Sequence, residues 1–222
     1  MKDITIKERV RWKKKFLYYF PKGFADEKYY AWERGYKWEA HLAWEKDLNK
    51  KKYQELLDKK EYSEIALRAV RLETKTNLLF SFEKMALRDA VKPVEGAKAF
   101  AEGLYEYVYG KTSFQKRFED FSEVLGSLPR KQTRVRTWPL QTVFGFIANP
   151  RENIFLKPRV TQIAAEKYEY KLAYRSKPNW ETYKSLLDFA EQARKDTTDL
   201  KPKDFIDLQS FIWVLGSDEY DD

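Results

Sequence analysis

The sequence predicts a mainly α-helical protein, a multi-helix single domain with a small β element at about residues 150–175 in its second half. Two observations predict this fold class. The 222 residues include only eight glycines and eight prolines, so long uninterrupted elements are expected. Apolar residues also recur at spacings of three, four and seven, which is typical of amphipathic helices.

The length of the chain fits one domain with a buried core. Aromatic residues make up 17% of it, so that core should be rich in rings. We expect residues 1–20 to form a basic N-terminal arm and residues 21–222 to form the helical domain. That domain could divide near residues 127–137, because "SLPRKQTRVRT" is typical of a connector or extended arm.

The first long helix is expected over residues 27–49, with Asp26 as its N-cap and Gly35 as its weak point. Its tryptophans recur every six residues and therefore point to three different sides of a helix. They are Trp32, Trp38 and Trp44. Aromatic residues all round a helix indicate burial on most sides, so we expect this helix to be central in the fold.

Further helices follow in the first half of the chain. A helical stretch is expected over residues 63–91, with a break near residues 74–77. The next helix begins at Pro93 and ends at Gly110, because proline is favoured in the first turn of a helix and glycine just beyond its end.

Capping residues define the remaining helices. Ser113 caps a helix that Gly126 closes, and Asn179 caps another helix in the second half. The last helix begins at Pro202 and is stopped by Gly216.

The β prediction depends on residues 168–174, "YEYKLAY", in which large apolar side chains alternate with others at a period of two. Residues 153–157, "NIFLK", are the expected partner strand. The ten residues between them could hold a short helix capped by Thr161.

Three residues of the first long helix are weak catalytic candidates. Arg34, His41 and Glu45 fall along one stripe of a helix, and His41 is the only histidine in the chain. A single histidine is more often structural than catalytic, so we favour a hydrogen bond between His41 and Glu45 on a half-buried stripe.

Arg34 and His41, with six residues between them, resemble the Arg-x(4 to 6)-His signature of the HEPN ribonucleases, which are also α-helical. The resemblance implies metal-independent RNA cleavage, with the histidine in acid/base work and the arginine stabilising phosphate charge. The polar residue that usually follows the arginine is replaced here by Gly35.

Metal and cofactor sites are not predicted. With one histidine and no cysteine, the usual zinc patterns are excluded, and an all-carboxylate site would need acids from different helices. The candidates are Glu39, Glu45, Glu73, Glu83 and Asp89. Thr76 and Glu83 fall in register with the apolar stripe of residues 63–91, which a helix edge or a buried salt bridge to Arg68 or Arg88 would explain.

The best functional signal is local positive charge. Of the net charge of +8, most comes from residues 1–20 and 129–159, while residues 217–222 carry four acids. Both basic segments interleave Lys and Arg with aromatic rings, which combines phosphate neutralisation with base stacking. We expect the two segments to form one surface for a polyanion. The predicted binding residues are Arg11, Trp12, Lys13, Lys14, Lys15, Arg130, Lys131, Arg134, Arg136 and Trp138.

These patterns predict a protein that binds nucleic acid or acts as an accessory in nucleic-acid transactions, with DNA or RNA left open. Two alternatives remain. One is a nuclease that uses Arg34 and His41 or a magnesium-dependent carboxylate site, and the other is a scaffold for a protein partner.

Location is predicted from absences in the sequence. The longest stretch without charged residues is fourteen residues, shorter than the roughly 20 that a membrane helix needs, and no secretory signal is recognisable. Since cysteine is also absent, we expect a cytoplasmic protein without a membrane partner.

Three stretches resemble an uncharacterised bacterial protein family: "GFIANPRENIFLKPRVTQIAA", "PNWETYKSLLDFAEQ" and "DLQSFIWVLGSDEY". The resemblance implies a bacterial intracellular protein and adds no site residues.

Overall fold

The computed structural model describes residues 6–131 and 133–221, with side chains described from Val10 onward. Helices account for 71% of the chain, and the fold is all-α. The described residues contain no β-strand, so the small β element predicted at about residues 150–175 is wrong.

Short turns connect most helices of the described residues, and longer segments follow α8, α9 and α10. In chain order they are α1 (Ile6–Tyr19), α2 (Glu27–Tyr29), α3 (Gly35–Asp47), α4 (Lys50–Asp58), α5 (Tyr62–Glu73), α6 (Ser81–Val91), α7 (Val94–Tyr109), α8 (Phe114–Ser127), α9 (Trp138–Ala148), α10 (Pro158–Lys167), α11 (Trp180–Asp196) and α12 (Phe205–Gly216). A π-helical turn, Tyr30–Arg34, joins α2 to α3, and single 3-10 turns occur at Gly23–Ala25 and Thr198–Leu200.

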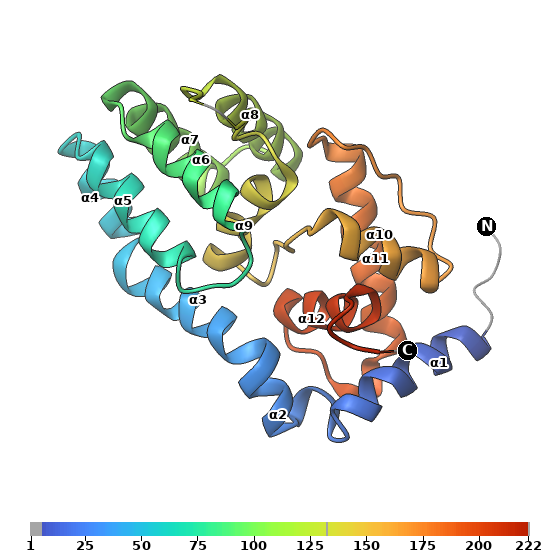
Figure 1. Ribbon diagram of the computed structural model, residues 1–222. Coiled ribbons are helices and arrows are strands. Elements are labelled where there is room, and N and C mark those ends of the chain that lie inside the picture. Colours follow the sequence, from blue (N-terminus) through green and yellow to red (C-terminus); the bar gives the residue numbers. More distant parts are fainter. Residues whose placement is uncertain (1–5, 132, 222) are drawn as a thin grey trace.

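Figure 1 shows these helices in two groups, α3–α9 on one side and α10–α12 with α1 on the other. The linker of residues 149–157 connects the groups. Buried apolar side chains from both groups belong to one continuous core. None of the described helices combines the length and the apolar character needed to cross a bilayer.

Residues 153–157 are buried and extended, but side-chain hydroxyls rather than a strand satisfy their backbone. The N–H of Ile154 donates to the Tyr183 hydroxyl over 3.1 Å, and that hydroxyl donates to the Ile154 carbonyl over 3.2 Å. The N–H of Leu156 donates to Thr142 Oγ1 over 3.1 Å. Because these backbone groups already have hydrogen-bond partners, the segment does not pair with another strand.

Side-chain hydroxyls also bond to the backbone of residues 168–174. The Ala173 N–H donates to Ser185 Oγ over 3.0 Å, and the Ala173 carbonyl accepts from Thr182 Oγ1 over 2.6 Å. One side of the segment packs against the core through partly buried side chains. They are Tyr170, Leu172 and Tyr174. An extended segment lying on a helix surface therefore produces the alternation that predicted a strand.

The helices at the centre are α9 and α12. Every residue of α9 is buried, and it carries no charged residue, so it can be covered on all sides. The helix predicted to be central, residues 27–49, forms over residues 27–47 and instead runs along the edge of the molecule (Figure 1), and Trp32 is 56% exposed. Its outer side carries exposed charged residues, Lys28, Glu39, Glu45 and Lys46, whereas Glu33 and Lys37 are buried.

Most predicted helix boundaries are confirmed. Asp26 accepts from the Lys28 N–H, Ser113 from Lys116 and Asn179 from Thr182, as N-caps. The predicted break lies between α5 and α6, and Pro93 and Gly110 flank α7.

Three boundaries and three helices differ from the prediction. Helix α8 passes through Gly126, α10 begins at Pro158 instead of Thr161, and Asp204 rather than Pro202 caps α12. Helices α4 and α9 were not predicted, and α1 forms where a basic arm was expected, because Trp12, Phe16 and Phe20 pack into the core. For α9 the reason is physical: a helix buried on all sides shows no amphipathic period.

Candidate functional site

Arg34 is a structural residue. Its guanidinium is buried and makes a bidentate pair with Asp204, at 2.8 and 2.7 Å, and a 2.7 Å bond to Asp207. The first effect on its pKa is burial, which lowers it, but hydrogen bonds and charges from the two carboxylates outweigh burial and raise the pKa. Since these three bonds hold the N-terminus of α12, Arg34 has no free face for a phosphate.

His41 lies apart from that network. Its Nδ1 donates to the carbonyl of Ile147 over 2.9 Å, and its ring lies 4.9 Å from the Trp38 ring. The predicted bond from His41 to Glu45 is wrong, because Glu45 is exposed and the histidine points to the end of α9. Arg34 and His41 therefore do not form the pair that the ribonuclease resemblance requires.

The basic residues of the first segment lie on α1, which packs against α12 (Figure 1). Trp12 is 4% exposed and its indole N–H donates to the Lys167 carbonyl, so its ring has no free face for a base. Lys13 pairs with Asp199 at 3.0 Å, and Lys15 donates to the Tyr220 carbonyl. Of the other two predicted residues, Arg11 lies over the Trp12 ring and Lys14 is exposed.

The second basic segment runs along the connector from α8 to α9. Trp138 is 1% exposed and its indole N–H donates to the Arg175 carbonyl, so it too cannot stack on a base. Arg130 and Lys131 are both exposed. Figure 1 places this connector and α1 at different ends of the molecule, so the prediction that the two segments form one surface is wrong.

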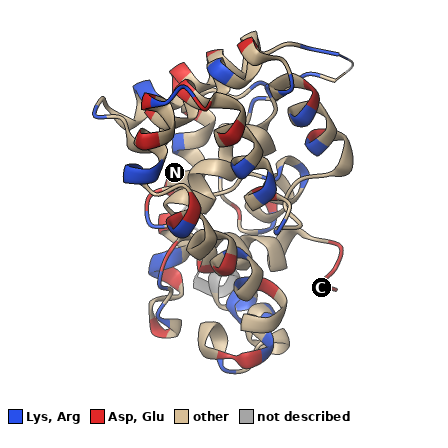
Figure 2. Cartoon of the chain, turned by 90° about the vertical axis from the view of Figure 1, so that its left-hand side faces the viewer, with Lys and Arg blue, Asp and Glu red and all other residues tan. Residues whose placement is uncertain are grey.

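Charges elsewhere are mixed. Figure 2 shows Lys and Arg interspersed with Asp and Glu on the side that faces the viewer. Oppositely charged residues also pair along single helices, as in Lys116–Asp120 and Lys184–Asp188. Such exposed pairs contribute little to stability and leave no continuous basic face. A functional surface is therefore expected where exposed charged residues line a concave site.

Charged residues line a cleft of about 760 Å³ between the two groups of helices. One wall comes from the start of α6 and the connector before α9, and the other from the start of α10, the end of α12 and the residues that follow it. Its charged and aromatic lining residues are Phe80, Phe82, Glu83, Arg134, Arg136, Trp138, Lys157, Arg159, Trp213, Asp218 and Glu219. The cleft has the size of a typical ligand site.

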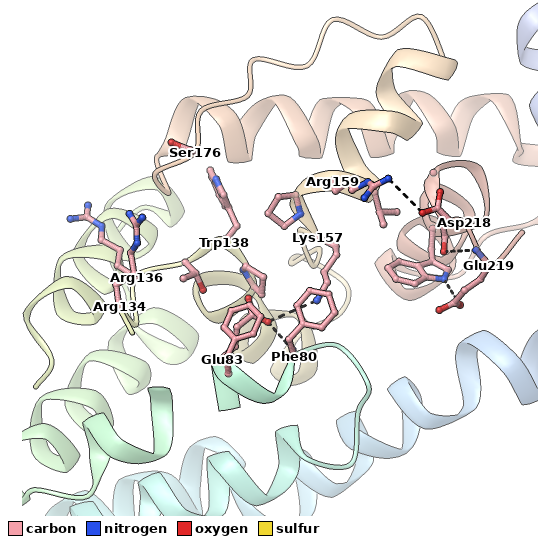
Figure 3. Close-up of a pocket in the computed structure, with 18 residues that line it drawn as sticks. Phe80, Glu83, Arg134, Arg136, Trp138, Lys157, Arg159, Ser176, Asp218 and Glu219 are labelled. Atoms are coloured by element: carbon pink, nitrogen blue, oxygen red, sulfur yellow. Dashed lines mark hydrogen bonds and ion pairs between the residues drawn. The ribbon is translucent and has the colours of Figure 1, made fainter. Parts of the chain in front are cut away.

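Three arginines stand around the mouth of the cleft (Figure 3). Arg134 is exposed and makes no ion pair with any described residue. Arg136 is held at 2.7 Å from Glu123, and Arg159 lies 3.7 Å from Asp218 with both side chains at least 80% exposed. An exposed pair at that distance is weak, so Arg159 can exchange its partner for another anion at small cost.

Two exposed aromatic rings line the same cleft. Phe80 and Phe82 are 56% and 52% exposed, and their rings are stacked with centroids 5.6 Å apart. The turn between α5 and α6 presents them, because the N–H of Phe80 donates to Glu83 over 2.8 Å and so fixes the start of α6. Exposed large rings in a concave site are more informative than scattered ones.

Lys157 forms the floor. Its Nζ donates to the Leu78 carbonyl over 2.9 Å, lies 3.3 Å from the Phe80 ring centroid and 3.9 Å from a Glu83 oxygen. Burial lowers the pKa of Lys157 against the opposing charge of Glu83, and burial raises the pKa of Glu83. Glu83 therefore pairs with Lys157 rather than with Arg68 or Arg88, which corrects the predicted partner.

Acids close the opposite rim. Asp218 faces Arg159, and Glu219 accepts from the indole N–H of Trp213 over 3.2 Å. The segment that carries them is anchored by Tyr220, whose hydroxyl donates to Glu33 over 2.6 Å. Any anionic ligand would meet these two carboxylates as well as the arginines.

The described part of the chain contains no cluster of side chains that could bind a metal ion. No three of its histidine, aspartate and glutamate side chains gather as a set of metal ligands. The scattered acids considered from the sequence do not form such a set in the described residues.

Sequence reasoning found part of the cleft and missed the rest. Arg134, Arg136 and Trp138 were predicted and do line it, whereas Lys157 and Arg159 were counted only in the charge of their segment. The phenylalanines and Trp213 come from distant helices and gave no local signal. Comparison of the chain with protein-family models, curated proteins and solved structures returns no match.

Proposed function

We propose that the protein binds single-stranded nucleic acid in this cleft, with phosphates at the arginines and a base on the exposed side of the Phe80–Phe82 ring pair. The observation that supports this most is the exposed, stacked pair of Phe80 and Phe82 in the same cleft as Arg134 and Arg159. Proteins that bind single strands combine cations along the backbone path with aromatic rings on which bases stack.

The shape of the site favours an unpaired strand. The rings lie inside a concave site, where a base must leave its own helical stack to reach them. A single strand presents its bases at little cost, whereas a duplex would first have to be opened. Stacking on a ring contributes about 1–3 kcal/mol per base.

The electrostatic part of the proposal is tested by changing the rim charges in both directions. Arg134→Gln together with Arg159→Gln should weaken binding of a fluorescent oligonucleotide, measured by anisotropy. If each arginine neutralises one phosphate, the slope of log affinity against log salt should become shallower by about 1.4. Asp218→Asn with Glu219→Gln should strengthen binding, because it removes repulsion and frees Arg159.

Matched controls separate the cleft from the general charge of the protein. Lys14→Gln with Lys50→Gln removes two exposed charges that do not line the cleft and should leave the slope unchanged. Phe80→Leu with Phe82→Leu should lower affinity without changing the slope. The proposal would be refuted if the Lys14/Lys50 variant weakened binding and changed the salt slope as much as the Arg134/Arg159 variant. Absence of binding at low salt would also refute it.

A further inference from the structure

A second, smaller chamber of about 220 Å³ adjoins the cleft. The two share lining residues, namely Phe80, Lys157, Trp213 and Glu219. The chamber reaches the helix of residues 27–47 on one side and α12 on the other. A group bound on Phe80 therefore has a neighbouring space into which it can extend.

Five of the twelve residues that line the chamber are aromatic. They are Trp32, Tyr36, Phe80, Phe155 and Trp213. Walls of this kind suit a flat ligand, because aromatic faces pack and stack on one another. The volume lies below the 300–1,000 Å³ of sites for drug-sized molecules, so the chamber suits a single small ring.

Gln209 lines the chamber and has an unsatisfied polar atom. The residue is 4% exposed, and its Oε1 accepts no hydrogen bond within the described part of the chain. Buried polar atoms are almost always bonded, and leaving one without a partner costs about 1–3 kcal/mol. That oxygen has almost no accessible surface, so the amide must turn toward the chamber before a ligand can donate a hydrogen bond to it and recover that energy.

The charged residues of the chamber differ in what they can offer. Lys37 already donates to Glu33 and Ser210, and Glu33 also accepts from Tyr220, so this group is internally satisfied. Lys157, by contrast, makes a single hydrogen bond, to a backbone carbonyl, within the described residues. Its ammonium group has further N–H donors for a ligand.

We propose that the chamber receives one pyrimidine base of the bound strand, thymine or uracil, whose ring N–H donates to Gln209 and whose carbonyl accepts from Lys157. This inference rests on the proposed function. Thymine and uracil present an N–H flanked by two carbonyls on the edge that an unpaired base exposes. Adenine has no carbonyl to offer Lys157, and guanine has two rings for a small space.

The test compares oligothymidylate and oligoadenylate of equal length on the wild type and on Gln209→Met. Methionine keeps the length of the side chain and removes its hydrogen bonds, so the fold should tolerate it. The wild type should bind oligothymidylate about tenfold more tightly, which corresponds to one hydrogen bond of about 1.4 kcal/mol. Gln209→Met should lose most of this preference and keep the same salt slope.

Because oligoadenylate also stacks on itself, the decisive quantity is the change in the affinity ratio between the two proteins. Gln141→Met is the matched control, since its Oε1 is equally unsatisfied but does not line the chamber or the cleft. An unchanged ratio in Gln209→Met, with the arginine variants still weakening binding, would overturn the base chamber and leave the proposed function intact. Failure of every oligonucleotide to bind would overturn both.

Discussion

At the scale of single residues, the turn before α6 concentrates buried polar groups next to the cleft. Thr76 is fully buried and donates to the Glu73 carbonyl, and Glu73, 1% exposed, lies 3.7 Å from Lys84. The sequence placed Thr76 and Glu83 on an apolar stripe but could not identify their partners, because these come from the turn itself and from Lys157 far along the chain. Spacing along a helix shows which side a residue occupies, not what will meet it there.

Glu73 should make stability depend on pH. Burial raises the pKa of its carboxyl from 4.5 to about 7, against the opposing effects of Lys84 and Thr76. The folded protein therefore holds this proton more tightly than the unfolded chain, so the free energy of unfolding should fall as pH rises from about 4.5 to about 7 and then level off. The loss attributable to Glu73 is about 3 kcal/mol.

The variant Glu73→Gln isolates this effect. Urea denaturation measures the free energy of unfolding of both proteins across the pH range. Relative to wild type, the value for the variant should rise by about 3 kcal/mol between about pH 4.5 and about pH 7.5. All other titrating groups are common to both proteins and cancel in the difference. A difference that does not change with pH would show that Glu73 titrates normally.

At the scale of elements, local signals sufficed where a helix carries its own cap or breaker, as at Asp26, Ser113 and Asn179. They failed where tertiary contacts decide. Residues 153–157 have the composition of a strand, yet hydroxyls from two helices satisfy their backbone. The cleft wall shows the same dependence, because a Cβ on Gly216 would collide with the Val160 carbonyl where α12 meets α10.

The contact that holds α12 to the helix of residues 27–47 is the Arg34 network. Tyr29 also donates to Asp207 over 2.6 Å, so removing the guanidinium leaves buried carboxylates without their counter-charge. Arg34→Ala should lower the free energy of unfolding by about 3–5 kcal/mol. Arg34→Lys keeps the charge but not the bidentate geometry and should cost less.

Urea denaturation followed by circular dichroism measures both variants, and the lysine variant keeps the comparison possible if the alanine variant does not fold. The account requires both to lose stability. Unchanged stability in Arg34→Ala, accompanied by loss of an RNA-cleaving activity, would instead restore the ribonuclease hypothesis.

At the scale of the whole molecule, the site is an assembly of distant parts. The phenylalanines come from the start of α6, the arginines from the connector and from α10, and Gln209 from α12. The sequence predicted the combination of cations with aromatic rings but assigned the rings to Trp12 and Trp138, which are buried. Nearness in sequence to the basic residues did not identify the exposed rings. Trp12 and Trp138 pack in the core, and the exposed rings of the cleft come from the start of α6.

The most direct measurement of the central claim is to cross-link oligothymidylate to the protein with ultraviolet light and to identify the modified residues by mass spectrometry. The account predicts adducts on Phe80 or Phe82 and on Trp213, and their loss when excess unlabelled oligothymidylate competes. Adducts confined to α1, or adducts that survive competition, would contradict the claim that this cleft binds the strand.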